Sequence, residues 1–172
     1  MEYIFLSGIH GVGKSTLATE LEKVMDIKTF SVSELIRKSG KDIDTVTKNT
    51  EHISSNQELW KVEINKLNIG DSKLLLDGHF CLLDKDKKIN PLPFTTFKDT
   101  HMTKIICIEG EPQIIRERLL NRDNNEYSIA LLEEFQKCEL EQATRYSCEN
   151  DISLFIYNET QPFSELIKFI KG

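Results

Sequence analysis

The 172-residue sequence lacks the features that mark exported, membrane and repetitive proteins. No long hydrophobic run is present, and the amino terminus, MEYIFLSG, has no basic region followed by a long apolar stretch. We therefore expect no signal peptide and no membrane span, and we expect a cytoplasmic protein. No internal repeat or low-complexity segment is visible, and the length suits a single domain over residues 1–172 with a sizeable core.

Excess positive charge and closely spaced cysteines are also missing. The chain has 22 basic residues against 28 acidic ones, so its formal net charge is −6. A general nucleic-acid or membrane-surface binder would show a basic face, so we expect neither partner, although a local positive pocket is compatible with this balance. The four cysteines form no C-x-x-C pair, which favours reduced structural thiols over a zinc site.

One strong motif is present, SGIHGVGKST at residues 7–16. The spacing Gly8-x-x-x-x-Gly13-Lys14-Ser15 fits the phosphate-binding loop, or P-loop. Glycines permit positive φ, so successive backbone N–H groups can point at one anion, and a following helix directs its positive end there. Lys14 would reach the β- and γ-phosphates, and the Ser15 hydroxyl would bind Mg²⁺. The residues expected to bind ATP are Gly8, His10, Gly11, Val12, Gly13, Lys14, Ser15 and Thr16.

Apolar runs and helical patterns alternate along the chain. Short apolar runs predict buried parallel strands near residues 2–7, 27–30, 73–77, 104–109 and 152–157. Helical spacing predicts helices over residues 14–25, 56–68, 112–121, 128–147 and 162–170. This alternation predicts a three-layer α/β fold with a parallel sheet, helices on both faces and ligands beyond the carboxyl ends of the strands.

The run Leu74-Leu75-Leu76-Asp77 is an apolar strand that ends in a carboxylate. Such an acid beside a P-loop is the Walker B residue, which holds Mg²⁺ together with the loop serine. We therefore predict that Ser15 and Asp77 bind magnesium. His79 follows closely, and its pattern is compatible with a structural role or with substrate binding.

Arginine is rare and unevenly placed. It occurs at positions 37, 116, 118, 122 and 145, whereas the other 17 basic residues are lysines. Arg118 and Arg122 are four residues apart on one helical face, positioned to clamp phosphates bidentately. The alternative is surface ion pairing, of Arg118 with Glu111 or of Arg122 with Asp123. Arg37 follows the second predicted strand, on a short helix that a serine at position 33 would start, where it could meet an acceptor phosphate.

Two polar segments fit the regular pattern poorly. Residues 38–55 are weakly periodic, and residues 84–93, DKDKKINPLP, combine a charge run with two prolines. We expect the second to be a solvated loop, and the alternative is that both segments border the substrate site.

In this order and spacing, SGIHGVGKST, SELIR, LLLDGHF and RERLLNRD resemble the adenylate kinase-like nucleoside monophosphate kinases over most of the chain. The similarity is greatest to the short-lid archaeal-type adenylate kinases, whose corresponding motifs read G-I-P-G-V-G-K-S-T, D-T-H and P-G-L-P. Here these motifs become GIHGVGKST, Asp77-Gly78-His79 and Asn90-Pro91-Leu92-Pro93.

The resemblance implies a P-loop NTPase fold with strand order 2-3-1-4-5, and phosphoryl transfer from Mg·ATP to a nucleoside monophosphate. It implies an acceptor-binding segment over about residues 31–70, with Arg37 as its arginine, and a short lid over about residues 118–128. Arg118 and Arg122 match the lid arginines, and Thr16 would reach the α-phosphate. The chain departs from bacterial and eukaryotic relatives at DGHF, where their D-G-[FY]-P-R motif carries an acceptor-binding arginine. His10 replaces the usual proline, and we expect it on the outer surface of the loop rather than over the phosphates.

We therefore expect a small-molecule kinase that uses ATP and Mg²⁺, with Lys14, Arg118, Arg122 and Asp77 at the site of transfer and a nucleoside monophosphate as acceptor. If the acceptor is instead a hydroxyl compound such as a nucleoside or sugar, Asp77 or His79 becomes the candidate base. The alternative outside this class is an ATP-binding switch or slow ATPase that acts through a protein partner.

Overall fold

The computed structural model describes residues 1–39 and 59–172, and residues 40–58 lie outside the description. Most of the predicted polar segment 38–55, part of the acceptor-binding segment 31–70 and the start of the predicted helix 56–68 fall in that gap. A helix is described over residues 59–64, followed by a turn at 65–66. Across the described part of the chain, no helix combines the length and the apolar character that crossing a membrane requires.

The centre of the fold is a five-stranded sheet in which every neighbouring pair of strands is parallel. Its order is β2-β3-β1-β6-β7. The strands are β1 Glu2–Ser7, β2 Ile27–Ser31, β3 Lys73–Asp77, β6 His101–Ile108 and β7 Ser153–Tyr157. Counted within this sheet alone, the arrangement is the predicted 2-3-1-4-5, so the predicted α/β fold is confirmed.

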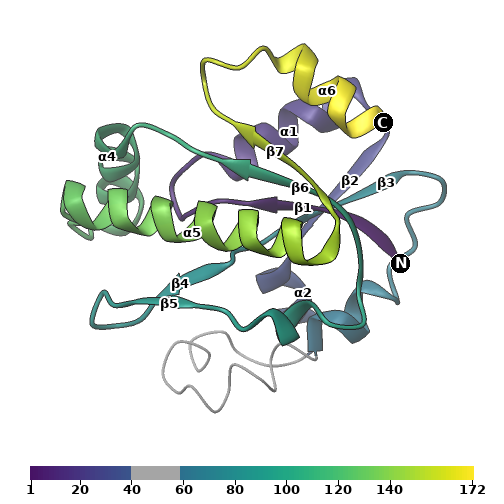
Figure 1. Cartoon of the computed structure of the whole chain (residues 1–172), viewed down its shortest axis with the longest axis horizontal. Coiled ribbons are helices and arrows are strands. Elements are labelled where there is room, and N and C mark those ends of the chain that lie inside the picture. The colour runs from purple at the N-terminus through teal and green to yellow at the C-terminus, as the bar shows by residue number, and fades with distance from the viewer. Residues whose placement is uncertain (40–58) are drawn as a thin grey trace.

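Helices cover both faces of the sheet, and Figure 1 shows α1 and α6 on one side and α5 and α2 on the other. Alternate residues of β1 explain the two layers, because successive side chains on a strand point to opposite faces. Ile4 and Leu6 pack in one apolar cluster, whereas Tyr3 and Phe5 pack in a second. The helices are α1 Lys14–Val24, α2 Val32–Lys38, α4 Pro112–Asp123, α5 Ile129–Asn150 and α6 Phe163–Lys171.

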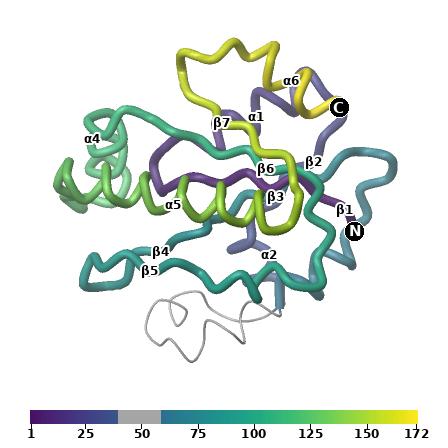
Figure 2. The backbone as a smooth tube through the Cα atoms, viewed as in Figure 1, coloured from purple at the N-terminus to yellow at the C-terminus, as the bar shows by residue number. Residues whose placement is uncertain are grey.

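A two-stranded antiparallel hairpin was not predicted. It joins β4 Cys81–Leu83 to β5 Ile89–Pro91 and is followed by a short 3₁₀ helix, η2 Phe94–Phe97. The charged stretch forms its turn, where Asp84 accepts backbone hydrogen bonds from Asp86 and Lys88 and a side-chain bond from Asn90. The hairpin packs beside α5, as the backbone trace in Figure 2 shows. Part of the predicted solvated loop is therefore ordered structure.

The start of α2 differs from the prediction by two residues. Ser31, rather than Ser33, caps the helix: its hydroxyl accepts the backbone N–H of Glu34, and the Glu34 carboxylate accepts the backbone N–H of Ser31. This reciprocal capping box requires a serine and a glutamate three residues apart, and only position 31 has that spacing. The helix therefore begins directly after β2, which places α2 at the carboxyl edge of the sheet.

Candidate nucleotide-binding site

The P-loop connects β1 to α1 at the carboxyl edge of the sheet. Gly8, Gly11 and Gly13 have φ values of 149°, 79° and 109°, all in the region that favours glycine. A Cβ on Gly11 would lie 2.9 Å from Leu119, so α4 closes directly over the loop. Gly13 precedes α1 without any side-chain cap, which leaves the first N–H groups of the helix available for an anion.

Lys14 is buried at the base of this loop. Its Nζ donates hydrogen bonds to the Gly8 carbonyl at 2.6 Å and the Ile9 carbonyl at 3.3 Å, and it lies 3.7 Å from Asp77 Oδ1. Burial lowers the pKa of Lys14, and the charges of Asp77 and Glu139 oppose this shift. Because three oxygen atoms surround Nζ, the ammonium is the form that the geometry satisfies.

Asp77 ends β3 next to the start of the P-loop. Cross-strand pairing places it beside Leu6 of β1 and Ser31 of β2. Burial raises the pKa of Asp77, and Lys14 opposes the shift. Asp77 and Ser15 line the same cavity, so a carboxylate and a hydroxyl face the place where the phosphates would lie. These hard oxygen donors fit Mg²⁺, which keeps several of its water ligands.

This cavity has a volume of about 730 Å³ and two parts of different chemistry. One part is lined by the P-loop, Asp77, Arg118 and Arg122. The other is lined by β2, α2, Trp60 and η2, and it presents hydroxyl groups, Glu34 and apolar side chains. Among the described residues that line the cavity, every lysine and arginine belongs to the first part: Lys14, Arg118 and Arg122.

The two predicted lid arginines both lie at the cavity but are held differently. Arg118 Nη1 donates to the carbonyls of Gly11 at 3.4 Å and Val12 at 3.2 Å, rather than pairing with Glu111. Arg122 makes a bidentate ion pair with Asp123 at 2.7 and 2.5 Å, which is the alternative that the sequence left open. Both side chains are exposed, and phosphate binding by either one stays a prediction.

The remaining arginines lie away from the cavity lining. Arg37 is exposed near the end of α2 and is not among the residues that line the cavity. Arg145 pairs with Glu149 at 2.7 Å and lies over the Phe94 ring. The structure therefore gives Arg145 a structural contact, and acceptor binding by Arg37 stays a prediction.

His10 and His79 lie against each other, with ring centroids 4.2 Å apart. Both line the large cavity, and His79 Nδ1 is buried without a hydrogen-bond partner. Burial lowers the pKa of His79 well below its ordinary value, and the nearby Lys14 adds to this shift, so the ring is neutral near pH 7. His10 is exposed to solvent and its ring also lines the cavity, so its expected place on the outer surface of the loop stays a prediction.

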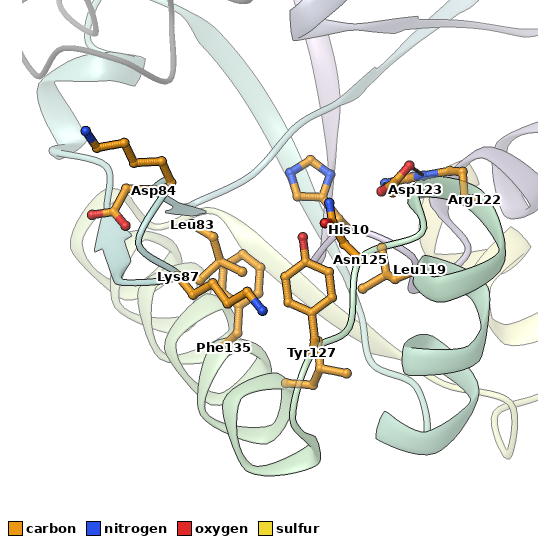
Figure 3. Close-up of a pocket in the computed structure, with 12 residues that line it drawn as sticks. His10, Leu83, Asp84, Lys87, Leu119, Arg122, Asp123, Asn125, Tyr127 and Phe135 are labelled. Atoms are coloured by element: carbon orange, nitrogen blue, oxygen red, sulfur yellow. Dashed lines mark hydrogen bonds and ion pairs between the residues drawn. The ribbon is translucent and has the colours of Figure 1, made fainter.

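A smaller cavity of about 340 Å³ lies between the hairpin, the segment that joins α4 to α5, and α5, and it shares His10, Leu119 and Arg122 with the larger one. Figure 3 shows the Tyr127 side chain extending toward His10, with Lys87 beside it. Lys87 Nζ lies 5.1 Å from the Tyr127 ring centroid and donates to the Glu126 carbonyl at 2.6 Å. The hairpin therefore holds the segment between α4 and α5, where the sequence predicted a lid.

Glu139 of α5 was missed by the sequence reasoning. Its side chain is only 1 % exposed, and both carboxylate oxygens accept backbone N–H groups from the P-loop and from the turn after β3. The available signal was its position on the apolar face of α5, in register with four buried neighbours: Leu132, Phe135, Ala143 and Tyr146. An acid in the middle of an apolar helical stripe requires buried partners.

Comparison with known proteins adds a family and a fold. The AAA_17 family, described as an AAA domain, matches residues 7–136, which include the P-loop, Asp77, Arg118 and Arg122. No curated protein sequence matches significantly. Among solved structures, a gluconokinase from Sinorhizobium meliloti 1021 is similar, with a TM-score of 0.52 and 13% sequence identity. That similarity covers 97% of this chain and 87% of the other, and it shows the fold.

Proposed function

We propose that this chain, which belongs to the AAA_17 family of AAA domains, is a P-loop kinase that transfers the γ-phosphoryl group of Mg·ATP to a small acceptor. The observation that carries the proposal is the two-part cavity of about 730 Å³. One part has the groups that bind a triphosphate, and the other extends past Asp77 to α2, Trp60 and η2. A second compartment of this kind suits an acceptor, whereas a nucleotide switch has no need of one.

The residues of the first part would position and neutralise the donor. The loop amides and Lys14 bind the phosphates, and Arg118 and Arg122 lie close enough to turn from their present partners toward negative charge that develops during transfer. Ser15 and Asp77 would hold Mg²⁺, which neutralises phosphate charge when bound. Transfer of a phosphoryl group needs little covalent chemistry from the protein, so alignment and charge provide most of the rate.

The acceptor that the described walls favour is a neutral hydroxyl compound. A monophosphate would need cations at its end of the cavity, and the described lining there offers hydroxyl groups and Glu34 instead. The neutral His79 lines the cavity, and a rotation that turns its buried Nδ1 toward the cavity would let it accept a hydrogen bond from the acceptor hydroxyl and orient it, with Asp77 as the alternative base.

A nucleoside monophosphate is the second candidate acceptor, as in the adenylate kinases that the motifs resemble. The observation that favours it is Arg37, which belongs to the same short helix as the cavity-lining residues Ser33 and Glu34. A small rotation of α2, or a different conformation of the long Arg37 side chain, would bring the Arg37 guanidinium toward an acceptor phosphate.

A coupled assay of ADP release tests the proposal. Purified protein with Mg·ATP is offered a panel of nucleoside monophosphates, nucleosides and sugars, and the phosphorylated product is identified by mass spectrometry. We expect acceptor-dependent ADP release with one hydroxyl compound. ADP and inorganic phosphate at the same rate with every acceptor would instead support the slow ATPase or switch.

A further inference from the structure

A single buried carboxylate, Glu139, connects the two segments that carry the site. It lies midway along α5, between the part of the helix that packs with one apolar cluster and the part that packs with the other. Nothing in the proposed transfer of phosphate places this residue in contact with a ligand. A charged side chain that is only 1 % exposed therefore requires another explanation.

All the hydrogen bonds that Glu139 accepts come from backbone N–H groups. Oε1 accepts from Gly8 at 3.1 Å and from Phe80 at 2.9 Å, and Oε2 accepts from Phe80 at 3.0 Å and Cys81 at 2.7 Å. A carboxylate is an acceptor on both oxygens, so the ionised form satisfies each of these donors, whereas a protonated carboxyl would present a hydrogen to one of them. Hydrogen bonds to an ionised acceptor are about twice as strong as neutral ones.

The hydrogen-bond partners of Glu139 identify the two backbone segments that its carboxylate holds. Gly8 is the first residue of the P-loop, and its carbonyl accepts the 2.6 Å hydrogen bond from Lys14. Phe80 and Cys81 directly follow Asp77, which ends β3, and Gly78-His79, and all three of these preceding residues line the cavity. One side chain thus fixes the loop that would bind the triphosphate relative to the turn that carries the candidate Mg²⁺ ligand and the candidate acceptor-binding histidine.

We propose that Glu139 is a positioning residue, whose carboxylate sets the distance and orientation between the P-loop and the Asp77–His79 turn. The inference rests on the proposed function in taking the P-loop to bind nucleotide. A carboxylate suits this role because three buried N–H groups converge on its two oxygens. The charge is retained in the core because it orders the backbone of two segments whose side chains also meet, through Lys14 with Asp77 and His10 with His79.

The isosteric substitution Glu139→Gln tests the proposal. The amide oxygen can accept two of the three N–H groups, and the amide nitrogen then faces the third, which is left unpaired and repelled. We expect the Kd for a non-hydrolysable Mg·ATP analogue to rise roughly 10- to 100-fold, the range expected when a charged hydrogen bond or a supporting contact is lost. Binding is measured by calorimetry without acceptor, at a temperature well below the melting point of each variant.

Two control variants separate positioning from stability and from charge. Leu166→Ala, on α6, removes core packing at a buried residue that lines neither cavity, so it should lower the melting temperature while leaving the Kd for the analogue close to wild type. Glu133→Gln removes an exposed charge from α5 itself, six residues before Glu139, and should change neither the melting temperature nor the Kd. If Glu139→Gln does not fold, Glu139→Asp keeps the charge, shortens the reach by one methylene group and should show the same loss of affinity.

Wild-type affinity in a folded Glu139→Gln protein, or an equal loss of affinity in Leu166→Ala, would overturn the proposal. Because no acceptor is present, the outcome is independent of whether the chain proves to be a kinase. A protein that binds the analogue but phosphorylates no acceptor would refute the proposed function alone.

Discussion

Replacing Gly11 with alanine tests how tightly α4 closes the P-loop. The substitution has two costs. Gly11 has a φ of 79°, where an L-residue is disfavoured by about 1–2 kcal/mol. The new Cβ would also lie 2.9 Å from Cγ and 3.1 Å from Cδ2 of Leu119, a buried side chain that has little room to move. Overpacking of this kind costs about 1–3 kcal/mol.

Together these two costs should lower the free energy of unfolding of Gly11→Ala by roughly 2–5 kcal/mol. For a chain of this length each kcal/mol shifts the melting temperature by about 2–4 °C, so we expect a drop of roughly 4–20 °C. The assay is thermal unfolding followed by circular dichroism, together with the Kd of a Mg·ATP analogue. We expect weaker binding as well, because the alanine displaces the loop amides that would hold the phosphates.

Gly70→Ala is the matched control for this experiment. Gly70 also has a positive φ, of 61°, but nothing lies within 4 Å of the position that its Cβ would occupy, and it lines neither cavity. It should therefore lose only about 1–2 kcal/mol and bind the analogue normally. If both variants melt at the same temperature and bind equally well, α4 does not constrain the loop as described.

Three further predictions concern the site directly. Lys14→Ala should abolish Mg·ATP turnover while the far-ultraviolet circular dichroism stays unchanged, and unaltered turnover would remove Lys14 from the mechanism. If the acceptor is a nucleoside monophosphate, Arg37→Ala should raise the KM of the acceptor far more than that of ATP, and equal effects on both would mean that Arg37 is not at the acceptor site. Chelation of Mg²⁺ with EDTA should stop turnover, and added Mg²⁺ should restore it. The Asp77→Asn protein should require more Mg²⁺ than wild type to reach its half-maximal rate. Activity that persists in EDTA would argue against Ser15 and Asp77 as Mg²⁺ ligands.

The fold was accessible from the sequence because its signals are local. Runs such as Leu74-Leu75-Leu76 are apolar on both faces of the strand, as a covered parallel sheet requires, and the P-loop spacing fixes where β1 ends and α1 begins. The start of β6 at His101 was missed. It depends on a register shift opposite Tyr3 and Ile4, which no property of residues 101–103 alone reveals.

The hairpin was missed for a different reason. Each of its strands has three residues, and the alternating pattern that predicts a strand needs at least four. Its stability comes from contacts with α5 and from the turn around Asp84, and both are tertiary rather than sequential features. The charge run at the turn reads as a solvated loop unless those contacts are known.

The candidate site was predicted in its donor half and only partly in the rest. Lys14 and Ser15 belong to a motif whose spacing is itself the geometry, and Asp77 was predicted beside them because it ends an apolar strand of the same parallel sheet. The contact of His10 with His79 and the position of Glu139 between two backbone segments depend on how separate strands and α5 meet. Such convergence of distant residues has no signature in the spacing of any one segment.

Identification of the phosphorylated product tests the central claim most directly. The wild-type protein is incubated with Mg·ATP and the acceptor panel, and the products are followed by ³¹P nuclear magnetic resonance. We predict that ATP is consumed together with one acceptor, giving equal amounts of ADP and of a phosphorylated acceptor. Formation of ADP and inorganic phosphate alone, with every acceptor unchanged, would contradict the account.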